Sequence, residues 1–267
     1  MKKPKIKSWG LLALATPILV TFAGLELAKA QSTPELLISL EFSGPQRPAS
    51  TGTTGGGARG SCNPEVDRQE KKKLTALIPR KINQDGNVII LAGTTSLTQP
   101  TFFLYVPENN SKEKELAEFR VNEIVNEKSG LSYQSEKNFY SADIEISNYS
   151  DSIVKLALPQ NVNLEANKEY TWSFNIICDA EDRSVDASVE GSIKKVEISS
   201  ELENQLKNVS PLERAKIYAE AKIWHETIYA VAEVRENNPG EWEELLKSVG
   251  LEDFVDDSIK EIKPAVE

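Results

Sequence analysis

One short stretch, residues 170–178, constrains the fold more than any other part of the sequence. Large apolar or aromatic residues occupy every second position there: Tyr170, Trp172, Phe174, Ile176 and Cys178. Successive side chains of a β-strand point to opposite faces, so these five share one face, which must be buried. Less regular runs of the same kind lie at residues 74–78, 88–91, 102–106, 119–125, 140–146, 153–158 and 185–198.

Eight candidate strands at this spacing predict an antiparallel β-sandwich of about 7–8 strands. Asp85-Gly86-Asn87 is typical of a hairpin turn. In the last run the apolar positions change parity around Lys194 and Lys195, which predicts a β-bulge there.

Cys62 and Cys178 are the only cysteines of the chain. In an oxidising compartment an even number of cysteines indicates a bridge, so we expect a Cys62–Cys178 disulfide, with two buried thiols as the alternative. Trp172 shares a strand with Cys178, and Cys62 precedes the first strand. The sequence therefore predicts an immunoglobulin-like sandwich without the cysteine pair that joins the two sheets of antibody domains.

The C-terminal part has a helical period. Ser210-Pro211-Leu212-Glu213 is a helix start, and apolar residues then recur at three- and four-residue steps up to about Asn237. A second start at Asn238-Pro239 leads to a stop at Gly250. We expect an αα-hairpin of two helices, with a short helix before it at residues 199–207.

The first thirty residues resemble a secretory signal. Lysines at positions 2, 3, 5 and 7 precede an apolar run over residues 9–24, and Ala28-Lys29-Ala30 is a small-x-small cleavage site before Gln31. The run is shorter than a membrane span, so an uncleaved anchor is the less favoured alternative and no stable membrane insertion is expected after cleavage. Loss of five lysines and one glutamate takes the formal charge from −10 to −14. Such a charge argues against nucleic acid and anionic membranes as partners.

Composition divides the rest of the chain. Residues 43–61 are almost entirely Gly, Ser, Thr, Pro, Ala and Arg, which favours a flexible linker, and an apolar island at residues 36–40 could dock or stay mobile. We expect a signal peptide at 1–30, a leader at 31–61, a β-sandwich at 62–198, a helical hairpin at 199–251 and a frayed acidic tail at 252–267.

Two places are candidate binding sites. Phe103 and Tyr105 lie on the strand face opposite Phe102, so one aromatic set could be exposed and stack on a sugar or peptide, although burial of both is the alternative. Asp182 and Arg183 lie in an acidic turn beside Cys178. The carboxylates of residues 179–182 could gather around calcium, but their spacing favours a solvated turn with an Arg183 ion pair.

No catalytic residue, metal site or cofactor is expected. His225 is the only histidine, and a paired cysteine cannot act as a nucleophile, so a Cys-His dyad and a His-rich zinc site are excluded. Beside Trp224 on a helix, His225 is typical of a structural or solvent-facing residue rather than a catalytic one.

Several motifs in a fixed order are similar to those of the cyanobacterial family catalogued as domain of unknown function 928. The resemblance covers nearly all of residues 43–251 and rests on Arg59-Gly60 with Cys62, residues 74–79, 100–107 and 170–174, Cys178-Asp179 with Arg183-Ser184, residues 221–225 and residues 242–251. It implies a cyanobacterial, exported protein, and it implies no activity or functional residue.

Three functions stay open. The first is a non-enzymatic periplasmic or cell-surface binding module, whose partner is an envelope protein or a glycan. The second is a structural or assembly component of the cell envelope, which predicts self-association. The third is a carboxylate-based hydrolase of envelope polysaccharide, which needs two acids about 5 to 10 Å apart across a groove.

Overall fold

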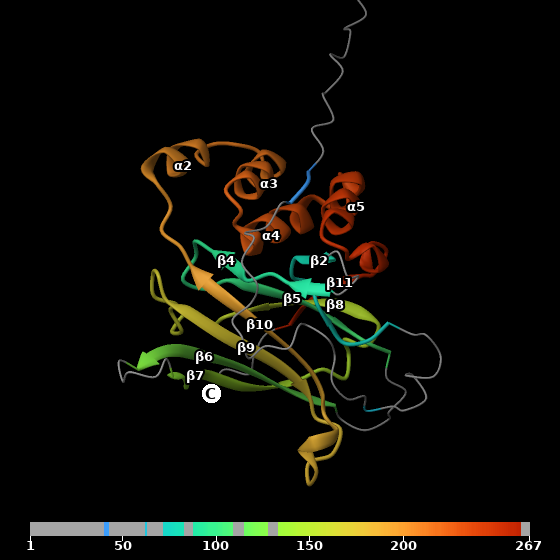
Figure 1. The fold of residues 1–267 in the computed structure, drawn as a ribbon. Coiled ribbons are helices and arrows are strands. Elements are labelled where there is room, and N and C mark those ends of the chain that lie inside the picture. The colour runs from blue at the N-terminus through green and yellow to red at the C-terminus, as the bar shows by residue number, and fades with distance from the viewer. Residues whose placement is uncertain are drawn as a thin grey trace, which may run out of the picture. The chain divides into compact units, whose positions relative to one another are not determined.

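The computed structural model describes residues 40–42, 62, 72–82, 88–108, 115–127 and 133–262. All of them belong to the compact unit Ser39–Glu267. The unit is mainly β, with helices in its C-terminal part (Figure 1). The predicted signal peptide, the glycine-rich linker and the turn Asp85-Gly86-Asn87 lie outside the described residues.

Two sheets form the β part. Sheet A has the order β1 (Thr75–Ala76), β5 (Thr101–Val106), β8 (Ser152–Ala157), β11 (Ile259–Ile262). Sheet B has the order β4 (Gly93–Thr95), β10 (Ala187–Lys195), β9 (Glu169–Ile176), β6 (Leu116–Glu127), β7 (Tyr133–Glu145). A separate hairpin pairs β2 (Arg80–Ile82) with β3 (Val88–Ile90), as the sequence predicted around residues 85–87.

The predicted strands are confirmed, but the sheets are not purely antiparallel. Strand β4 pairs with β10, and β11 with β8, in parallel. Both pairs lie at sheet edges and join segments far apart in the chain. A long connection lets the second strand run either parallel or antiparallel to the first. Whether the two sheets form an immunoglobulin-like arrangement stays a prediction.

The predicted bulge at Lys194 and Lys195 is wrong. Strand β10 pairs with β9 in unbroken register from Ala187 to Lys194 and ends at Lys195, so the change of parity marks the end of the strand. The register shift lies in the β6–β7 pair, where Phe139 is the extra residue between Asn138 and Tyr140.

Side chains of both sheets meet in one core, which we call the inter-sheet core. It includes alternate residues of β5, β6 and β9, and all are buried: Phe102, Leu104, Val106, Phe119, Val121, Tyr170, Trp172 and Phe174. The face predicted from residues 170–178 is therefore buried at Tyr170, Trp172, Phe174 and Ile176.

The opposite face of sheet A packs against the helices in a second core, the helix-side core. Phe103 and Tyr105 of β5 and Ile153 of β8 meet Trp224, Trp242 and other apolar residues of the helices there. Strand β5 is thus buried on both faces. Figure 1 shows helices on one side of the strands, with β6, β7 and β9 on the far side.

Four helices follow β10: α2 (Ser200–Gln205), α3 (Pro211–Glu220), α4 (Trp224–Val234) and α5 (Pro239–Ser248). The first helix of the predicted hairpin is therefore two helices. The chain turns at Lys222, whose φ is 59°, and this left-handed conformation ends α3. Burial of Ile223 and Trp224, at 2% and 1% exposure, offsets the strain of the turn.

Residues 252–262 of the tail that was predicted to fray are folded. A 3-10 turn, η2 (Glu252–Phe254), leads into β11, which adds an edge strand to sheet A through backbone hydrogen bonds and buries Ile262. Because backbone pairing does not depend on side-chain type, the acidic composition concealed this strand.

Residues 40–42 fall in the predicted leader but are docked on the helices. Leu40 and Phe42 belong to the helix-side core, and the Phe42 ring lies edge-on to Trp224 with centroids 4.9 Å apart. Their backbone N–H groups donate to Glu244 Oε2 and Ser248 Oγ. The chain before Cys62 is therefore fixed to the helices at these residues.

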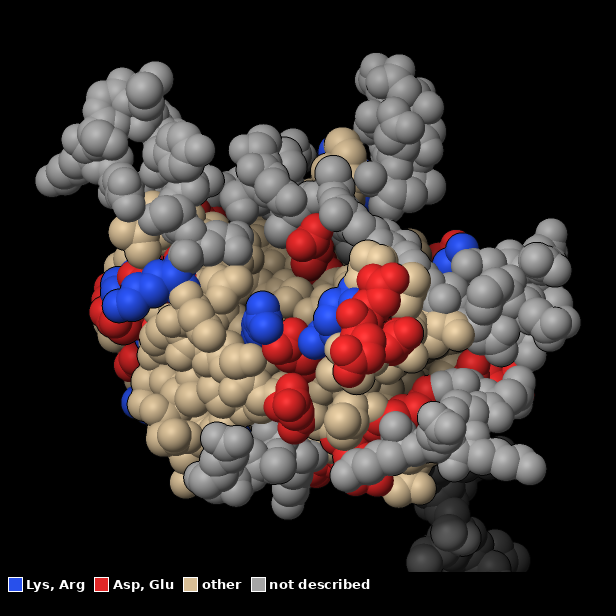
Figure 2. All heavy atoms as spheres, turned by 90° about the horizontal axis from the view of Figure 1, so that it is seen from below, with Lys and Arg blue, Asp and Glu red and all other residues tan. Residues whose placement is uncertain are grey.

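Figure 2 views the face opposite the helices. The described acidic and basic side chains are interspersed there, and they form no continuous basic patch in this view. Among the described residues, none of the helices combines the length and apolar character that a membrane crossing requires.

Candidate functional site

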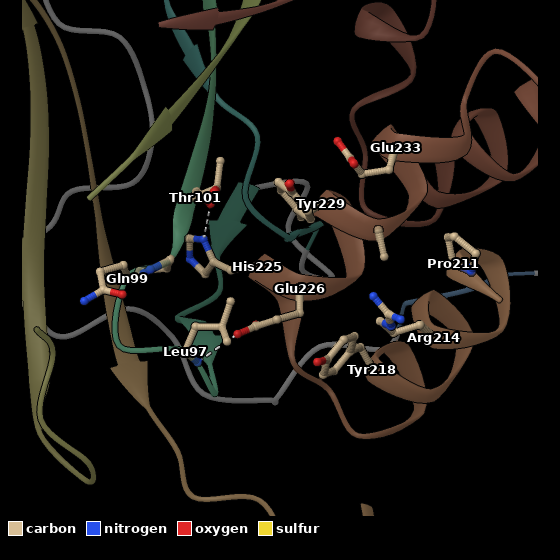
Figure 3. Close-up of a pocket in the computed structure, with 12 residues that line it drawn as sticks. Leu97, Gln99, Thr101, Pro211, Arg214, Tyr218, His225, Glu226, Tyr229 and Glu233 are labelled. Atoms are coloured by element: carbon tan, nitrogen blue, oxygen red, sulfur yellow. Dashed lines mark hydrogen bonds between the residues drawn. The ribbon is translucent and has the colours of Figure 1, made fainter. Parts of the chain in front are cut away.

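A pocket of about 470 Å³ lies between α3, α4 and the segment that leads into β5 (Figure 3). That segment supplies Leu97, Gln99, Pro100 and Thr101. Helix α3 supplies Pro211, Arg214 and Tyr218, and α4 supplies His225, Glu226, Tyr229, Ala230 and Glu233. The volume suits a small ligand.

His225 lies in the first turn of α4 and is 3% exposed. Its Nδ1 is 3.0 Å from the carbonyl oxygen of Thr101, and the Phe102 ring packs edge-on against the imidazole. A carbonyl only accepts, so Nδ1 carries the proton and Nε2 is an acceptor in the neutral ring. Burial lowers the pKa of His225 to about 4, and the Thr101 carbonyl offsets this only in part.

Glu226 is also buried, at 4% exposure, and it holds the turn after β4. Its Oε1 accepts hydrogen bonds from the side chain of Thr95 at 2.7 Å and from the backbone N–H groups of Ser96 at 2.8 Å and Leu97 at 3.0 Å. The Ser96 hydroxyl also donates to it at 3.2 Å. Burial raises the pKa of this carboxyl group, and these hydrogen bonds oppose the shift.

Two buried polar atoms of this wall lack a partner. Nε2 of His225 and Oε2 of Glu226 make no hydrogen bond with any described residue. A buried acceptor without a partner is costly. Nε2 lies against Gly93, which is not among the residues that line the pocket.

The α3 wall has a different character. Arg214 and Tyr218 are four residues apart and so share one face of α3, which Figure 3 shows opposite Glu226, Tyr229 and Glu233 of α4. The pKa of Tyr218 is raised by burial first and by the Glu226 carboxylate second, while Arg214 acts in the opposite direction. Leu97 and Tyr229 are 50% and 41% exposed, so the pocket has an open apolar edge.

Phe103 and Tyr105 do not form an exposed aromatic surface. They are 3% and 2% exposed in the helix-side core, and the Tyr105 hydroxyl donates to Asp151 at 2.7 Å. Burial and the Asp151 carboxylate raise the pKa of Tyr105. Neither ring is available at the surface to stack on a ligand, so the structure does not bring these residues into the pocket.

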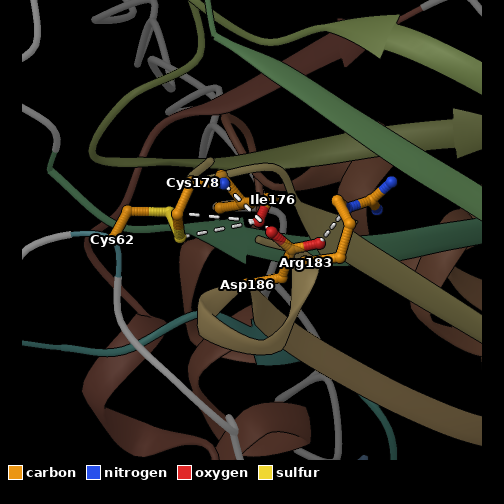
Figure 4. Close-up of a disulfide and its surroundings, with 5 residues drawn as sticks. All are labelled: Cys62, Ile176, Cys178, Arg183 and Asp186. Carbon is orange, nitrogen blue, oxygen red and sulfur yellow. Dashed lines mark hydrogen bonds and ion pairs between the residues drawn. A yellow bond between two sulfur atoms is a disulfide. The ribbon is translucent and has the colours of Figure 1, made fainter. Parts of the chain in front are cut away.

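The Cys62–Cys178 disulfide is confirmed, and Figure 4 shows Arg183 near it. Asp182 is the residue before Arg183 in the chain. Arg183 donates to Asp186 at 2.5 Å, and Asp186 accepts from the backbone N–H of Cys178 at 3.1 Å. The hydrogen bond to the Asp186 carboxylate, and the Glu118 carboxylate to a smaller extent, raise the pKa of Arg183. The predicted ion pair of Arg183 is thus present, with Asp186 as its main partner, and it holds the turn against the end of β9.

The carboxylates of the acidic turn accept local backbone hydrogen bonds. Asp179 accepts from the N–H of Glu181, and Asp182 from the N–H and hydroxyl of Ser184, which lowers the pKa of Asp182. In the part of the chain that the structure describes, no three His, Cys, Asp or Glu side chains gather as a metal site would require.

The sequence interpretation missed Arg214, Tyr218 and Glu226, and it treated His225 as structural. Glu226 follows the only histidine in a largely apolar helix, and an acid in such a segment is a weak signal of a buried polar contact. Its partners, residues 95–97, lie about 130 positions earlier in the chain, where no motif marks them.

Comparisons with known proteins agree with the motifs. The model of the family described as Domain of Unknown Function (DUF928) matches residues 54–259, which include the disulfide, the helices and all of the described strands except β11, of which only Ile259 is matched. No curated protein and no solved structure matches the chain. The match spans well over half of the sequence, so the chain belongs to the DUF928 family.

Proposed function

We propose that this protein is a non-enzymatic, extracytoplasmic binding module that takes a small polar ligand, or one unit of an envelope glycan, into the pocket between α3 and α4. The observation that carries the proposal is the pocket itself, about 470 Å³ in volume, in which the polar side chains of Gln99, Arg214 and Tyr218 lie beside an open apolar edge formed by Leu97 and Tyr229. A preformed concave site with a few placed polar groups and an apolar edge is the usual form of a ligand site.

Export and origin belong to the same proposal. The charged start, the apolar run and the cleavage site before Gln31 support secretion, and a disulfide is stable outside the cytoplasm. The family motifs support a cyanobacterial source. An immunoglobulin-like sandwich as the scaffold is likewise our proposal, supported by two sheets that share one core.

A hydrolase is less well supported by this pocket. Hydrolysis by two carboxylates needs a second acid facing Glu226 across a groove. The other carboxylate in the pocket, Glu233, lies two turns further along the same helix, is exposed, and is 3.4 Å from Lys155. Glu226 itself uses one oxygen to hold the 95–97 turn.

Ligand-observed NMR with a library of sugars, amino acids and organic acids tests the proposal. We expect a subset to bind the protein and to lose binding when Ala230→Phe fills the pocket. Because a larger side chain at a buried position can disturb folding, Tyr229→Ala at the exposed edge is a second variant, and Val185→Ala, an exposed apolar residue outside the pocket, is its control. Compounds that bind all variants equally, or a library without a single binder, would contradict the proposal.

An assembly component of the envelope stays the alternative for this family member. It predicts a mass above that of the monomer in light scattering, whereas a binding module of small ligands needs no self-association.

A further inference from the structure

The side chains of Lys72 and Asp257 meet beside the helix-side core, far from the pocket in the sequence. Lys72 precedes β1 and Asp257 precedes β11, which are the two edge strands of sheet A. The ion pair between them joins residues 185 positions apart. Nearly all of the described part of the chain therefore lies between these two residues.

Two aromatic rings lie next to the amino group of this pair. Nζ of Lys72 is 4.8 Å from the centre of the Tyr105 ring and 5.7 Å from the centre of the Phe254 ring, and both rings are buried. The side chain of Lys72 is 33% exposed and that of Asp257 is 9% exposed. The rings keep water away from one side of the pair, and exclusion of water protects reacting groups from side reactions.

The carboxylate of Asp257 is held against the amino group by its surroundings. The guanidinium group of Arg235 donates to the backbone carbonyl oxygens of Val255, at 2.6 Å, and of Asp257, which fixes this segment. Oδ1 of Asp257 contacts Lys72, whereas Oδ2 is buried and makes no hydrogen bond with any described residue. A buried carboxylate oxygen without a partner is costly, and conversion of the group to an amide removes its charge.

A second carboxylate, that of Asp151, lies at the equivalent position of the neighbouring strand. Ile153 of β8 pairs with Ile259 of β11 in parallel, so Asp151 and Asp257 each precede a paired residue by two positions. The Tyr105 hydroxyl donates to Asp151 at 2.7 Å. Burial raises the pKa of Tyr105 most, Asp151 raises it next and Asp257 raises it further, so both carboxylates act on the same hydroxyl group. A carboxylate placed in this way can accept a proton in passing.

We propose that the folded protein joins Lys72 to Asp257 through an amide bond between Nζ and Cγ. The ammonium group of Lys72 gives up two protons, its nitrogen bonds to Cγ, and one carboxylate oxygen leaves with the two protons as water. Asp151 takes up the first proton and returns it to the leaving oxygen. The step needs no oxidant, reductant or further reactant. Groups that a fold holds in contact react as if at an effective concentration of up to about 10⁸ M, which lets a slow condensation proceed.

The bond ties the two edge strands of sheet A to each other across β5 and β8. Unlike the Cys62–Cys178 disulfide, an amide bond is not opened by a reducing agent. The inference goes beyond the proposed function, because it does not depend on a ligand in the pocket.

Mass spectrometry of the chain from Gln31 onward, which keeps residues 40–42 in the helix-side core, tests the inference. The folded protein is kept at neutral pH, then denatured and reduced so that the disulfide does not affect the mass. We expect a mass lower than that of the sequence by one water molecule. Digestion with trypsin should release a branched peptide in which fragmentation locates the link at Lys72 and Asp257.

Lys72→Arg is the decisive variant, because arginine keeps the positive charge and its guanidinium group is always protonated and does not attack a carboxyl group. Its mass should equal that of its sequence. Lys73→Arg changes the exposed neighbouring residue as a matched control and should still lose one water molecule. Asp151→Asn removes the proton acceptor, so the linked fraction should form at least about tenfold more slowly.

Two results would overturn the inference. The folded protein could have the full mass of its sequence, or a loss of water could persist in Lys72→Arg or map to other residues. An unchanged rate in Asp151→Asn would overturn the role of Asp151 and leave the bond itself in place. The NMR screen of the pocket variants tests the proposed function separately.

Discussion

Nε2 of His225 lies against Gly93, so close that a methyl group added at position 93 would stand 2.7 Å from it. Gly93 is the first residue of β4, at the edge of sheet B, and His225 opens α4. This contact joins the edge of the sheet to the wall of the pocket. A side chain at position 93 would push the imidazole away from Thr101.

Gly93→Ala should therefore lower the free energy of unfolding by about 1–3 kcal/mol, the usual cost of overpacking, and should weaken any pocket ligand. Gly240→Ala is the control, since a methyl group there meets no atom within 4 Å. In α5 that change should be neutral or stabilise by up to about 1 kcal/mol. Equal stability of the two variants, measured by urea unfolding, would show that the Gly93 contact is not tight.

His225 should make the protein less stable as the pH falls from 6.5 toward 4. Its pKa is near 6.5 in the unfolded chain and about 4 in the folded protein, so the folded state binds fewer protons in this window. The stabilisation is complete above pH 6.5 and is lost as the pH falls through the window, by up to about 3 kcal/mol. Urea unfolding at several pH values gives the free energy of unfolding of the unmodified protein and of His225→Asn. The contribution of His225 is the difference between the pH dependences of these two free energies.

Glu226 acts in the opposite direction in the same experiment. Its folded pKa is raised, so its contribution is present at low pH and is lost as the pH rises through that pKa. Glu226→Gln removes this contribution and should steepen the loss of stability on acidification. Identical pH profiles for the protein and His225→Asn would contradict a buried neutral imidazole.

Because residues 40–42 are docked on the helices, a substitution there should lower the stability of the protein strongly, although these residues belong to no strand or helix. Phe42→Ala should cost about 3–5 kcal/mol, because the ring is buried against Trp224. Glu41→Ala, at the exposed position between Leu40 and Phe42, should change stability by less than about 0.5 kcal/mol. If Phe42→Ala and Glu41→Ala have the same thermal stability, residues 40–42 are not part of the core.

Removal of the disulfide should destabilise the protein by about 2–5 kcal/mol in a Cys62→Ser, Cys178→Ser variant. The bridge joins residues 116 positions apart, so it restricts the unfolded chain strongly. A reducing agent should bring the unmodified protein to the stability of the variant. If the unmodified protein, denatured without a reducing agent, reacts with a thiol reagent, its two cysteines are free thiols and the bridge is absent.

The strands could be predicted from the sequence because their side-chain period is local. Residues 170–178 show this best, since their alternation alone identified the buried face. The two faces of β5 were left open, because a continuous apolar run such as residues 102–106 fits either one buried face or two. Coverage of Phe103 and Tyr105 depends on helices more than a hundred residues later.

The break between α3 and α4 and the pocket could not be predicted in the same way. The apolar period continues from Ile217 through Trp224 to Ile228, and Lys222 has no intrinsic preference for the left-handed conformation it adopts. The turn follows from burial of Ile223 and Trp224 against distant strands. The pocket residues Arg214 and Glu226 are brought together only by this turn, so the local sequence carries no sign of the site.

The position at which a ligand binds tests the proposed pocket. Amide chemical shifts of the isotope-labelled protein should be recorded with the tightest-binding compound from the screen. If the pocket is the binding site, the changes gather at residues 95–101 and 214–233, around His225 and Glu226. Changes gathered elsewhere, for example in the turn of Asp182 and Arg183 beside the disulfide, would contradict the pocket as the binding site.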